Sequence, residues 1–241
     1  MLVSDTLFGI RDKVQEAIDL LRKHEPPEGY YLAFSGGKDS VCIYRLAEMA
    51  GVKFDAHYNV TTVDPPELVQ FIKKEYPQVN FHLPKETMWQ LIVRKGYPPT
   101  RIARFCCEKL KEGSGGNRFV ITGVRRDESA KRKGRNEVWK FKKKIILQPI
   151  YYWAETEVWD FIETQGLKYC SLYDDPGLSR LGCIMCPMSS IQKRKYEAHR
   201  YPKFNQAYLR TFDRMLKVRR ERGRKTEWQS AQEVMDWWLS N

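Results

Sequence analysis

Residues 35–40 form the run SGGKDS, whose residue types can together bind an anion. Its two glycines allow the backbone to turn sharply and to bring amide N–H groups close to a negative charge. The lysine adds a positive charge, the serines add hydroxyl donors, and a helix starting after the turn adds the positive end of its dipole. An ordinary strand-to-helix turn needs none of these polar side chains. The run therefore predicts a phosphate-binding loop made of Ser35, Gly36, Gly37, Lys38, Asp39 and Ser40.

The spacing of this loop separates it from two common phosphate-binding patterns. The Walker pattern places four residues between its first glycine and its Gly-Lys pair, and the dinucleotide fingerprint is GxGxxG. Residues 35–40 fit neither pattern. The spacing alone leaves open which phosphate compound the loop binds.

Four of the six cysteines form two close pairs, in the runs FCCEKLK and GCIMCPMS. A CxxC lets both thiolates face one centre, and an adjacent pair brings the number of soft ligands to four, which suits zinc or an iron–sulfur cluster. An ordinary zinc ribbon uses two spaced pairs, so the adjacent pair argues against it. The other two cysteines, Cys42 and Cys170, are predicted to be small buried thiols.

The elements that position these residues follow from the spacing of apolar side chains. Helical spacing predicts an amphipathic helix over residues 6–24, ended by Pro26 and Pro27. Apolar runs then alternate with helical segments, which predicts an α/β fold with a doubly wound parallel sheet. The expected strands are YYLAF, KFDAHYNV, QVNFHLP, RFVITGV and KKIILQPI, and the expected helices after the loop helix span about 65–76, 86–95, 104–112 and 155–166.

The pattern changes after about residue 166, to a loop, the second cysteine pair and two basic helices. We therefore expect residues 1–166 to form the nucleotide-binding α/β domain. Residues 167–241 are expected to form a loop carrying the cysteine pair and a helical extension, packed on that domain as a single structural unit.

The positive charge of the chain is concentrated in two stretches. The net charge is +12, with ten Lys/Arg against three Asp/Glu in residues 125–144 and thirteen against three in residues 193–225. A single basic run is usually a solvated face. Two such runs favour a polyanionic partner such as nucleic acid. With no membrane-length apolar run and no signal peptide, we expect a cytoplasmic protein with no membrane partner; no feature indicates an oligomeric state.

The loop matches in full the SGGxDS signature of the PP-loop family, the N-type ATP pyrophosphatases and adenylyl-sulfate reductases, which the chain resembles. The resemblance implies an adenine nucleotide α-hydrolase-like fold that binds ATP or adenylyl sulfate at the carboxyl edge of the sheet. Many members split ATP into AMP and pyrophosphate with the help of Mg²⁺, and so adenylylate a substrate oxygen. It also implies catalytic roles for Lys38, Asp39 and Arg125.

The cysteines resemble the CC…CxxC pattern of the iron–sulfur branch of the phosphoadenylyl-sulfate and adenylyl-sulfate reductases. This resemblance implies a [4Fe–4S] cluster beside the nucleotide, held by Cys106, Cys107, Cys183 and Cys186. ITGVRRDESAKR resembles the family segment that grips phosphate or sulfate, and QPIYYWAETEVWDFI resembles a packing segment. The first of these segments implies an anion grip by Arg125, Arg126, Ser129 and Arg132.

One departure from the reductases bears on function. They carry a further cysteine near the C-terminus, in an ECGxH-like motif, which attacks sulfur, whereas the last cysteine here is Cys186. No other side chain does thiolate chemistry at sulfur. Reduction of adenylyl sulfate by this chain alone is therefore not expected.

Three functions remain open from the sequence. The first is an ATP pyrophosphatase with a cluster, acting in sulfur transfer to nucleic acid and similar to the enzymes of DNA phosphorothioation, with a sulfur donor such as a cysteine desulfurase. DNA is favoured over RNA because no separate RNA-binding domain is visible. The second is a reductase that takes its thiol from a partner or from Cys170, and the third is a non-catalytic binding module.

Two acids follow the second expected strand, in TTVDPPE. Asp64 and Glu67 are placed to contact Mg²⁺ or ribose, or else to cap and begin the next helix. The sequence does not choose between these roles.

Overall fold

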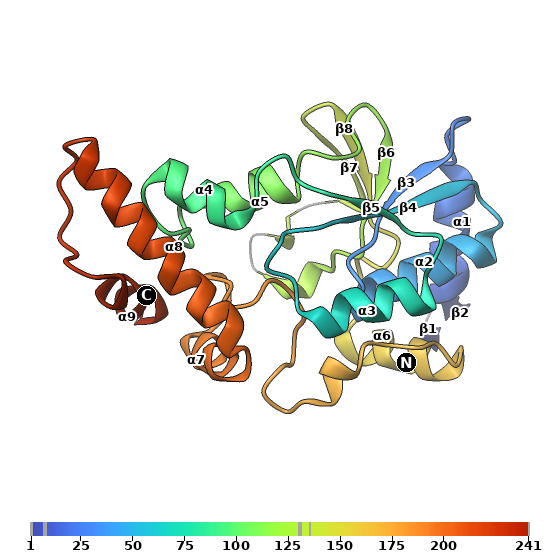
Figure 1. Cartoon of the computed structure of the whole chain (residues 1–241). Helices are drawn as coiled ribbons and strands as arrows, with labels where there is room; N and C mark the ends of the chain where they lie inside the picture. The colour runs from blue at the N-terminus through green and yellow to red at the C-terminus, as the bar shows by residue number, and fades with distance from the viewer. Residues whose placement is uncertain (1, 7–8, 130–131, 135, 241) are drawn as a thin grey trace. The chain divides into compact units, whose positions relative to one another are not determined.

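The computed structural model describes residues 2–6, 9–129, 132–134 and 136–240 (Figure 1). By their contacts these residues form two compact units that interleave along the chain. The first contains residues 1–58, 67–82 and 114–171, and the second contains residues 59–66, 83–113 and 172–241. The chain passes for the last time from the first unit to the second after residue 171, five residues beyond the expected boundary at residue 166. The linear division did not anticipate that residues 59–66 and 83–113 join the C-terminal residues.

The first unit is built on a six-stranded sheet with the order β5-β4-β3-β6-β8-β7. Strand β3 is parallel to β4 and β6, and β6 is parallel to β8, while the edge strand β7 is antiparallel to β8. This mostly parallel sheet confirms the predicted α/β class. The strands are β3 (Tyr30–Ala33), β4 (Phe54–Asn59), β5 (Asn80–His82), β6 (Phe119–Ile121), β7 (Val138–Phe141) and β8 (Lys144–Leu147).

Buried apolar side chains alternate between the two faces of the sheet. Leu32 pairs in register with Ile121, which pairs with Leu147, and all three are fully buried. The preceding residue of each strand faces the other side, where Tyr31, Val120 and Ile146 form a separate cluster. Helix α2 (Lys38–Ala50) packs against α1 (Lys13–Lys23) and α6 (Glu155–Thr164), and α3 (Pro66–Glu75) buries Leu68 and Ile72.

The predicted helix over residues 6–24 begins too early, because the observed helix starts at residue 13. Strands β1 (Val3–Thr6) and β2 (Gly9–Asp12) form an antiparallel pair where the helix over 6–24 was expected, and residues 7 and 8 lie outside the described residues. Helix α1 begins at residue 13 because Asp12 caps it. The Asp12 carboxylate accepts hydrogen bonds from the backbone N–H of Val14 at 2.9 Å and of Gln15 at 3.1 Å.

The second unit is helical. Helix α8 (Pro202–Glu221) packs against α4 (Met88–Lys95), α7 (Ile191–Arg200) and α9 (Ala231–Ser240). Three helices follow the second cysteine pair where two were predicted, because Pro202 starts a new helix directly after α7 and α9 is added. In its core Trp238 contacts the Tyr208 ring, and its indole N–H donates to the Pro99 carbonyl at 2.7 Å. Within the described residues, no helix has the length and apolar character needed to cross a membrane.

Candidate functional site

The SGGKDS loop connects the end of β3 to the start of α2 in the first unit. Gly36 has φ = +70°, and a Cβ atom there would lie 2.7 Å from Ile72 and 2.8 Å from Leu68, so the turn requires glycine. The Ser40 hydroxyl accepts from the Ser35 N–H at 3.2 Å and donates to the Gly37 carbonyl at 2.8 Å. These contacts fix the turn at the positive end of a 13-residue helix, which is a favourable place for a phosphate group.

Two buried cations meet at this loop. Lys38 is 4% exposed and Arg125 is 5% exposed. Strands β3 and β6 are parallel neighbours, so the segments that follow their carboxyl ends lie at one edge of the sheet. Arg125 Nε therefore reaches Asp39 Oδ1 at 2.6 Å, and Lys38 Nζ lies 3.6 Å from Asp39 Oδ2. The structure brings together the three residues for which catalytic roles were expected.

Sequence reasoning missed a fourth residue of this group, Glu155. Its carboxylate lies 3.1 Å from Lys38 Nζ and 4.0 Å from Arg125 Nη2. Glu155 is the first residue of α6, in the segment that the sequence assigned to packing. An acid that begins a helix soon after a parallel strand was the available signal, because that position lies at the carboxyl edge of the sheet.

The other predicted anion-gripping residues have different surroundings. Arg126 is exposed, with its guanidinium 5.4 Å from the centre of the Tyr152 ring. Arg132 pairs with Glu128 at 2.7 Å, and its backbone N–H donates to the carbonyl of the exposed Ser129 at 3.0 Å. Arg125 is thus the member of this set that the structure places on the loop.

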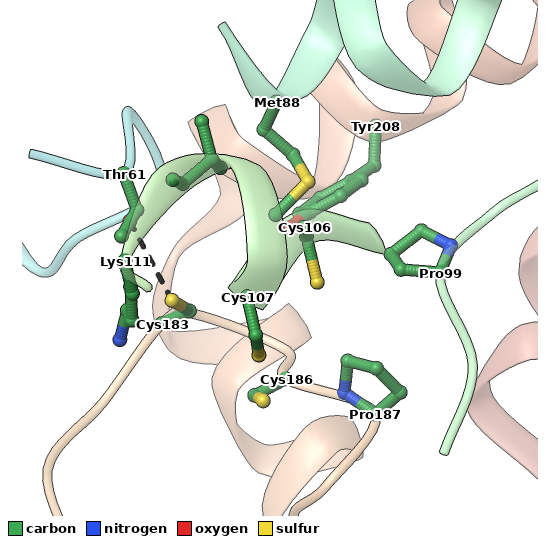
Figure 2. Close-up of a pocket in the computed structure, with 11 residues that line it drawn as sticks. Thr61, Met88, Pro99, Cys106, Cys107, Lys111, Cys183, Cys186, Pro187 and Tyr208 are labelled. Atoms are coloured by element: carbon green, nitrogen blue, oxygen red, sulfur yellow. Dashed lines mark hydrogen bonds between the residues drawn. The ribbon is translucent and has the colours of Figure 1, made fainter. Parts of the chain in front are cut away.

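The four paired cysteines line one cavity in the second unit (Figure 2). Cys106 and Cys107 lie on the short helix α5 (Phe105–Leu110), and Cys183 and Cys186 lie on the loop before α7. The cavity contains about 390 Å³ of empty space, counting the part open to solvent. Its other lining residues are Thr61, Met88, Pro99, Leu110, Lys111, Pro187 and Tyr208.

The CxxC turn is held by its two central residues. Ile184 and Met185 are fully buried, the Ile184 N–H donates to the Val63 carbonyl at 2.8 Å, and the Met185 N–H donates to the Glu197 carboxylate at 2.7 Å. Met185 has φ = +55°, which a side chain other than glycine rarely adopts. The surrounding packing therefore imposes this conformation, which brings the two flanking cysteines to the cavity.

The electrostatics of the cavity favour a thiolate at Cys107 and a neutral thiol at Cys106 and Cys186. A hydrogen bond from Cys106, together with one from Arg104, lowers the pKa of Cys107 to about 5, and the same Cys106–Cys107 bond raises the pKa of Cys106. The neighbouring Cys183 raises the pKa of Lys111, which keeps a cation at the cavity wall. Burial raises the pKa of Cys186. Since thiolates are the form that binds metals, the donor set suits a soft metal group.

The four cysteines of this cavity do not form a single-ion metal site in the structure. Among the residues that the structure describes, no three His, Cys, Asp or Glu side chains are grouped so as to hold one metal ion. The four cysteine side chains line one shared cavity.

The remaining two cysteines are buried in the first unit. Cys42 and Cys170 are both 0% exposed. Cys42 Sγ lies 3.6 Å from the Val158 carbonyl, and burial raises the pKa of its thiol. Both side chains have the surroundings of the small buried thiols that the sequence predicted.

The two acids left open by the sequence occupy different positions. Asp64 is 9% exposed and accepts hydrogen bonds from the backbone N–H of Thr61 at 2.6 Å and from its hydroxyl at 2.7 Å, so it stabilises a turn. Glu67 lies in the first turn of α3.

A glycine-rich anion loop after β3, with a buried arginine after its sheet neighbour β6, is the arrangement expected of a PP-loop nucleotide-binding enzyme. The comparison with known families agrees. The chain belongs to the phosphoadenosine phosphosulfate reductase domain family, whose family model matches residues 29–189.

Individual relatives are similar at a modest level. The chain is 28% identical to the uncharacterized protein MJ0066 of Methanocaldococcus jannaschii, over 71% of this chain and 39% of that protein. It is also 28% identical to an adenosine 5'-phosphosulfate reductase of Staphylococcus haemolyticus, over 68% of this chain and 70% of that protein. The chain thus spans about two fifths of the length of the first relative.

A solved structure supports the fold. The phosphoadenylyl-sulfate reductase of Candida auris, in a phosphate complex, superimposes with a TM-score of 0.53 at 17% identity, covering 70% of this chain and 88% of that one. At this identity the similarity concerns the fold alone.

Proposed function

We propose that the protein is an ATP pyrophosphatase that adenylylates an oxygen of a nucleic acid, so that sulfur can replace that oxygen. The observation that carries the proposal is the meeting of buried Lys38 and Arg125 at the SGGKDS loop. Such cations stabilise negative charge that develops on transferring phosphoryl oxygens. DNA phosphorothioation is the reaction of this kind that we favour, in a cytoplasmic setting.

The proposed first step is a substitution at the α-phosphorus of ATP. An acceptor oxygen forms a bond to this phosphorus, and the bond to the β-phosphate bridging oxygen breaks, so that pyrophosphate leaves with the bonding electrons. Lys38 stabilises charge on the phosphates, and Arg125 is suited to donate two parallel hydrogen bonds to a tetrahedral oxyanion. Mg²⁺ is the expected counter-ion of the nucleotide. A sulfide-level sulfur then attacks the activated centre, and the original oxygen leaves with AMP.

We propose that Cys106, Cys107, Cys183 and Cys186 hold a [4Fe–4S] cluster. The donor set fits this group because four sulfur ligands share one cavity whose other walls include Met88 and Leu110. When bound, such a cluster supplies electron-transfer or sulfur-handling chemistry. The protein's own contribution is to lower the pKa of Cys107 and to bring the four sulfur ligands to one cavity.

A basic stripe on α8 supports a nucleic-acid acceptor. Arg210, Arg214 and Lys217 follow one another at helical spacing and are exposed, while the opposite side of α8 buries Phe212 and Met215. Asp213 and Glu221 are also exposed on this helix and dilute the charge. By contrast, the Arg219 guanidinium is used inside the unit, where it donates to the Gly96 carbonyl at 2.6 Å. The stripe is therefore a surface that phosphate groups can contact.

Neutralising this stripe is expected to weaken DNA binding. The variant Arg210→Gln/Arg214→Gln/Lys217→Gln removes three cations, so the slope of log affinity against log salt should fall by roughly 3 units and binding at ~0.1 M salt should weaken by at least about tenfold. The measurement is titration of a labelled duplex at several salt concentrations. The matched control Lys53→Gln/Lys73→Gln/Lys74→Gln changes the same charge on exposed residues of the first unit. Equal loss in both variants would contradict a role for the stripe, and tighter binding of an RNA hairpin than of duplex would contradict the choice of DNA.

A second candidate is a reductase of adenylyl sulfate or phosphoadenylyl sulfate. The name of the Staphylococcus haemolyticus relative favours it. Cys170 does not suit the role of its nucleophile, because the thiol is 0% exposed. This candidate therefore needs a thiol from a partner protein.

Two incubations separate the candidates. With ATP, Mg²⁺ and DNA, anaerobically purified protein is expected to release pyrophosphate. With adenylyl sulfate and a reduced dithiol protein, it is expected to form no sulfite at enzymatic rates. Sulfite formation without pyrophosphate release would establish the reductase and end the proposal of adenylylation.

A further inference from the structure

Glu155 is an exposed acid whose carboxylate lies near two buried cations at the anion loop. Its carboxylate reaches Lys38 Nζ at 3.1 Å with one oxygen and Arg125 Nη2 at 4.0 Å with the other. The Lys38 and Arg125 side chains are 5% and 6% exposed, whereas the Glu155 side chain is 57% exposed. One partner of each ion pair is thus fixed in the protein, and the other can leave for water.

Glu155 does not supply the capping hydrogen bond of the helix that it begins. The backbone N–H of Ala154, at the start of α6, donates instead to Glu157 at 2.8 Å. The Glu157 carboxylate is buried and pairs with Lys13 at 2.7 Å. Glu157 therefore both caps α6 and anchors it, so the cap of α6 does not depend on Glu155.

The charges at the loop balance without a ligand. Lys38 and Arg125 contribute two positive charges, and Asp39 and Glu155 contribute two negative ones. A buried cation without a counter-charge is costly, so a balanced group is what a ligand-free site needs. A phosphate that binds beside Lys38 and Arg125 is repelled by the carboxylates of Asp39 and Glu155.

We infer that Glu155 is a resident counter-ion, which occupies the phosphate position on Lys38 and Arg125 and is displaced when a nucleotide phosphate binds. Asp39 stays, because it is held at 2.6 Å by Arg125 and is only 25% exposed at its side chain. Glu155 leaves, because its side chain already extends into solvent. The carboxylate therefore lowers the affinity of the loop for phosphate groups and keeps the cations paired between turnovers. This inference rests on the proposed phosphate-binding role of the loop.

The test compares anion binding by the wild-type chain, Glu155→Gln and Glu163→Gln. Glu163 is an exposed acid near the other end of the same helix, so its replacement makes the same change in net charge away from the loop. The probes are inorganic pyrophosphate and α,β-methylene-ATP, titrated by calorimetry with and without Mg²⁺. Circular dichroism and thermal melting confirm that each variant folds, which the exposure of both acids favours.

The expected result is that Glu155→Gln binds both probes about tenfold more tightly than wild type, while Glu163→Gln changes affinity by less than about twofold. Unchanged or weaker binding by Glu155→Gln, where the wild type binds, overturns the inference and leaves the proposed function standing. Weakening seen only with Mg²⁺ also overturns it, since Glu155 would then be a metal ligand. If neither probe binds to the wild type, the proposed function fails as well.

Discussion

On the proposed cluster assignment, Cys183→Ser is expected to lower the iron content and the visible absorbance of protein purified without oxygen. Serine has nearly the size of cysteine but offers a hard oxygen, which is a poor ligand for a soft cluster. The Cys183 thiol is partly exposed and lies 3.5 Å from the Thr61 hydroxyl, so serine can keep this contact without leaving a hole. We expect iron to fall from about four atoms per chain to less than about one.

The control for this experiment is Cys170→Ala. It removes a buried thiol of the first unit, which lies outside the cavity, and should leave the iron content per folded chain unchanged. Cys107→Ser repeats the test on the other cysteine pair, so that a folding fault in one variant does not decide the matter. Iron retained in both serine variants, or a colourless wild-type protein with stoichiometric zinc, would contradict the cluster.

The sheet could be predicted from the sequence because its signals are local. The run YYLAF is apolar throughout, as expected for a strand buried on both faces, and the glycines after it mark the turn into α2. Strand β7 escaped prediction for an equally physical reason. It joins β8 through a tight turn in which Lys142 has φ = +54°, and a lysine gives no turn signal at a position where glycine or asparagine is expected.

The helix start near the N-terminus was missed because two signals competed. Ile10, Val14, Ile18 and Leu21 continue one helical spacing, which hides the cap at Asp12. The helix starts after Asp12, although the apolar spacing extends further back, because the Asp12 side chain accepts hydrogen bonds from the first free amides of the helix.

In the candidate site, too, the residues that are contiguous in the sequence could be predicted, whereas a residue brought in by the fold could not. The loop from Ser35 to Ser40 is contiguous, so its chemistry can be read directly. Glu155 reaches Lys38 only because β8 lies beside β6 and α6 packs on α2. The spacing of residues along the chain does not contain that arrangement, and the acid was therefore assigned to packing.

The largest loss of catalysis is expected from Lys38→Met. Methionine fills most of the volume of the lysine stem and removes the charge, and Lys38 is 4% exposed, so water does not replace it easily. Removal of one preorganised donor to a developing oxyanion costs about 10²–10³-fold in rate. We expect pyrophosphate release from ATP to fall by about this factor, measured as kcat/KM under anaerobic conditions.

The fold should survive this change, because the partners of Lys38 keep other interactions. Asp39 remains bonded to Arg125 at 2.6 Å, and the Glu155 side chain can turn to solvent. Lys53→Met, at an exposed position, is the matched control and should retain wild-type rates. If Lys38→Met stayed within about threefold of wild type while melting at the same temperature, the loop would not be the place where phosphate charge is stabilised. The acceptor would then have to be activated somewhere other than the loop after β3, because Lys38 and Arg125 are the two cations that meet there.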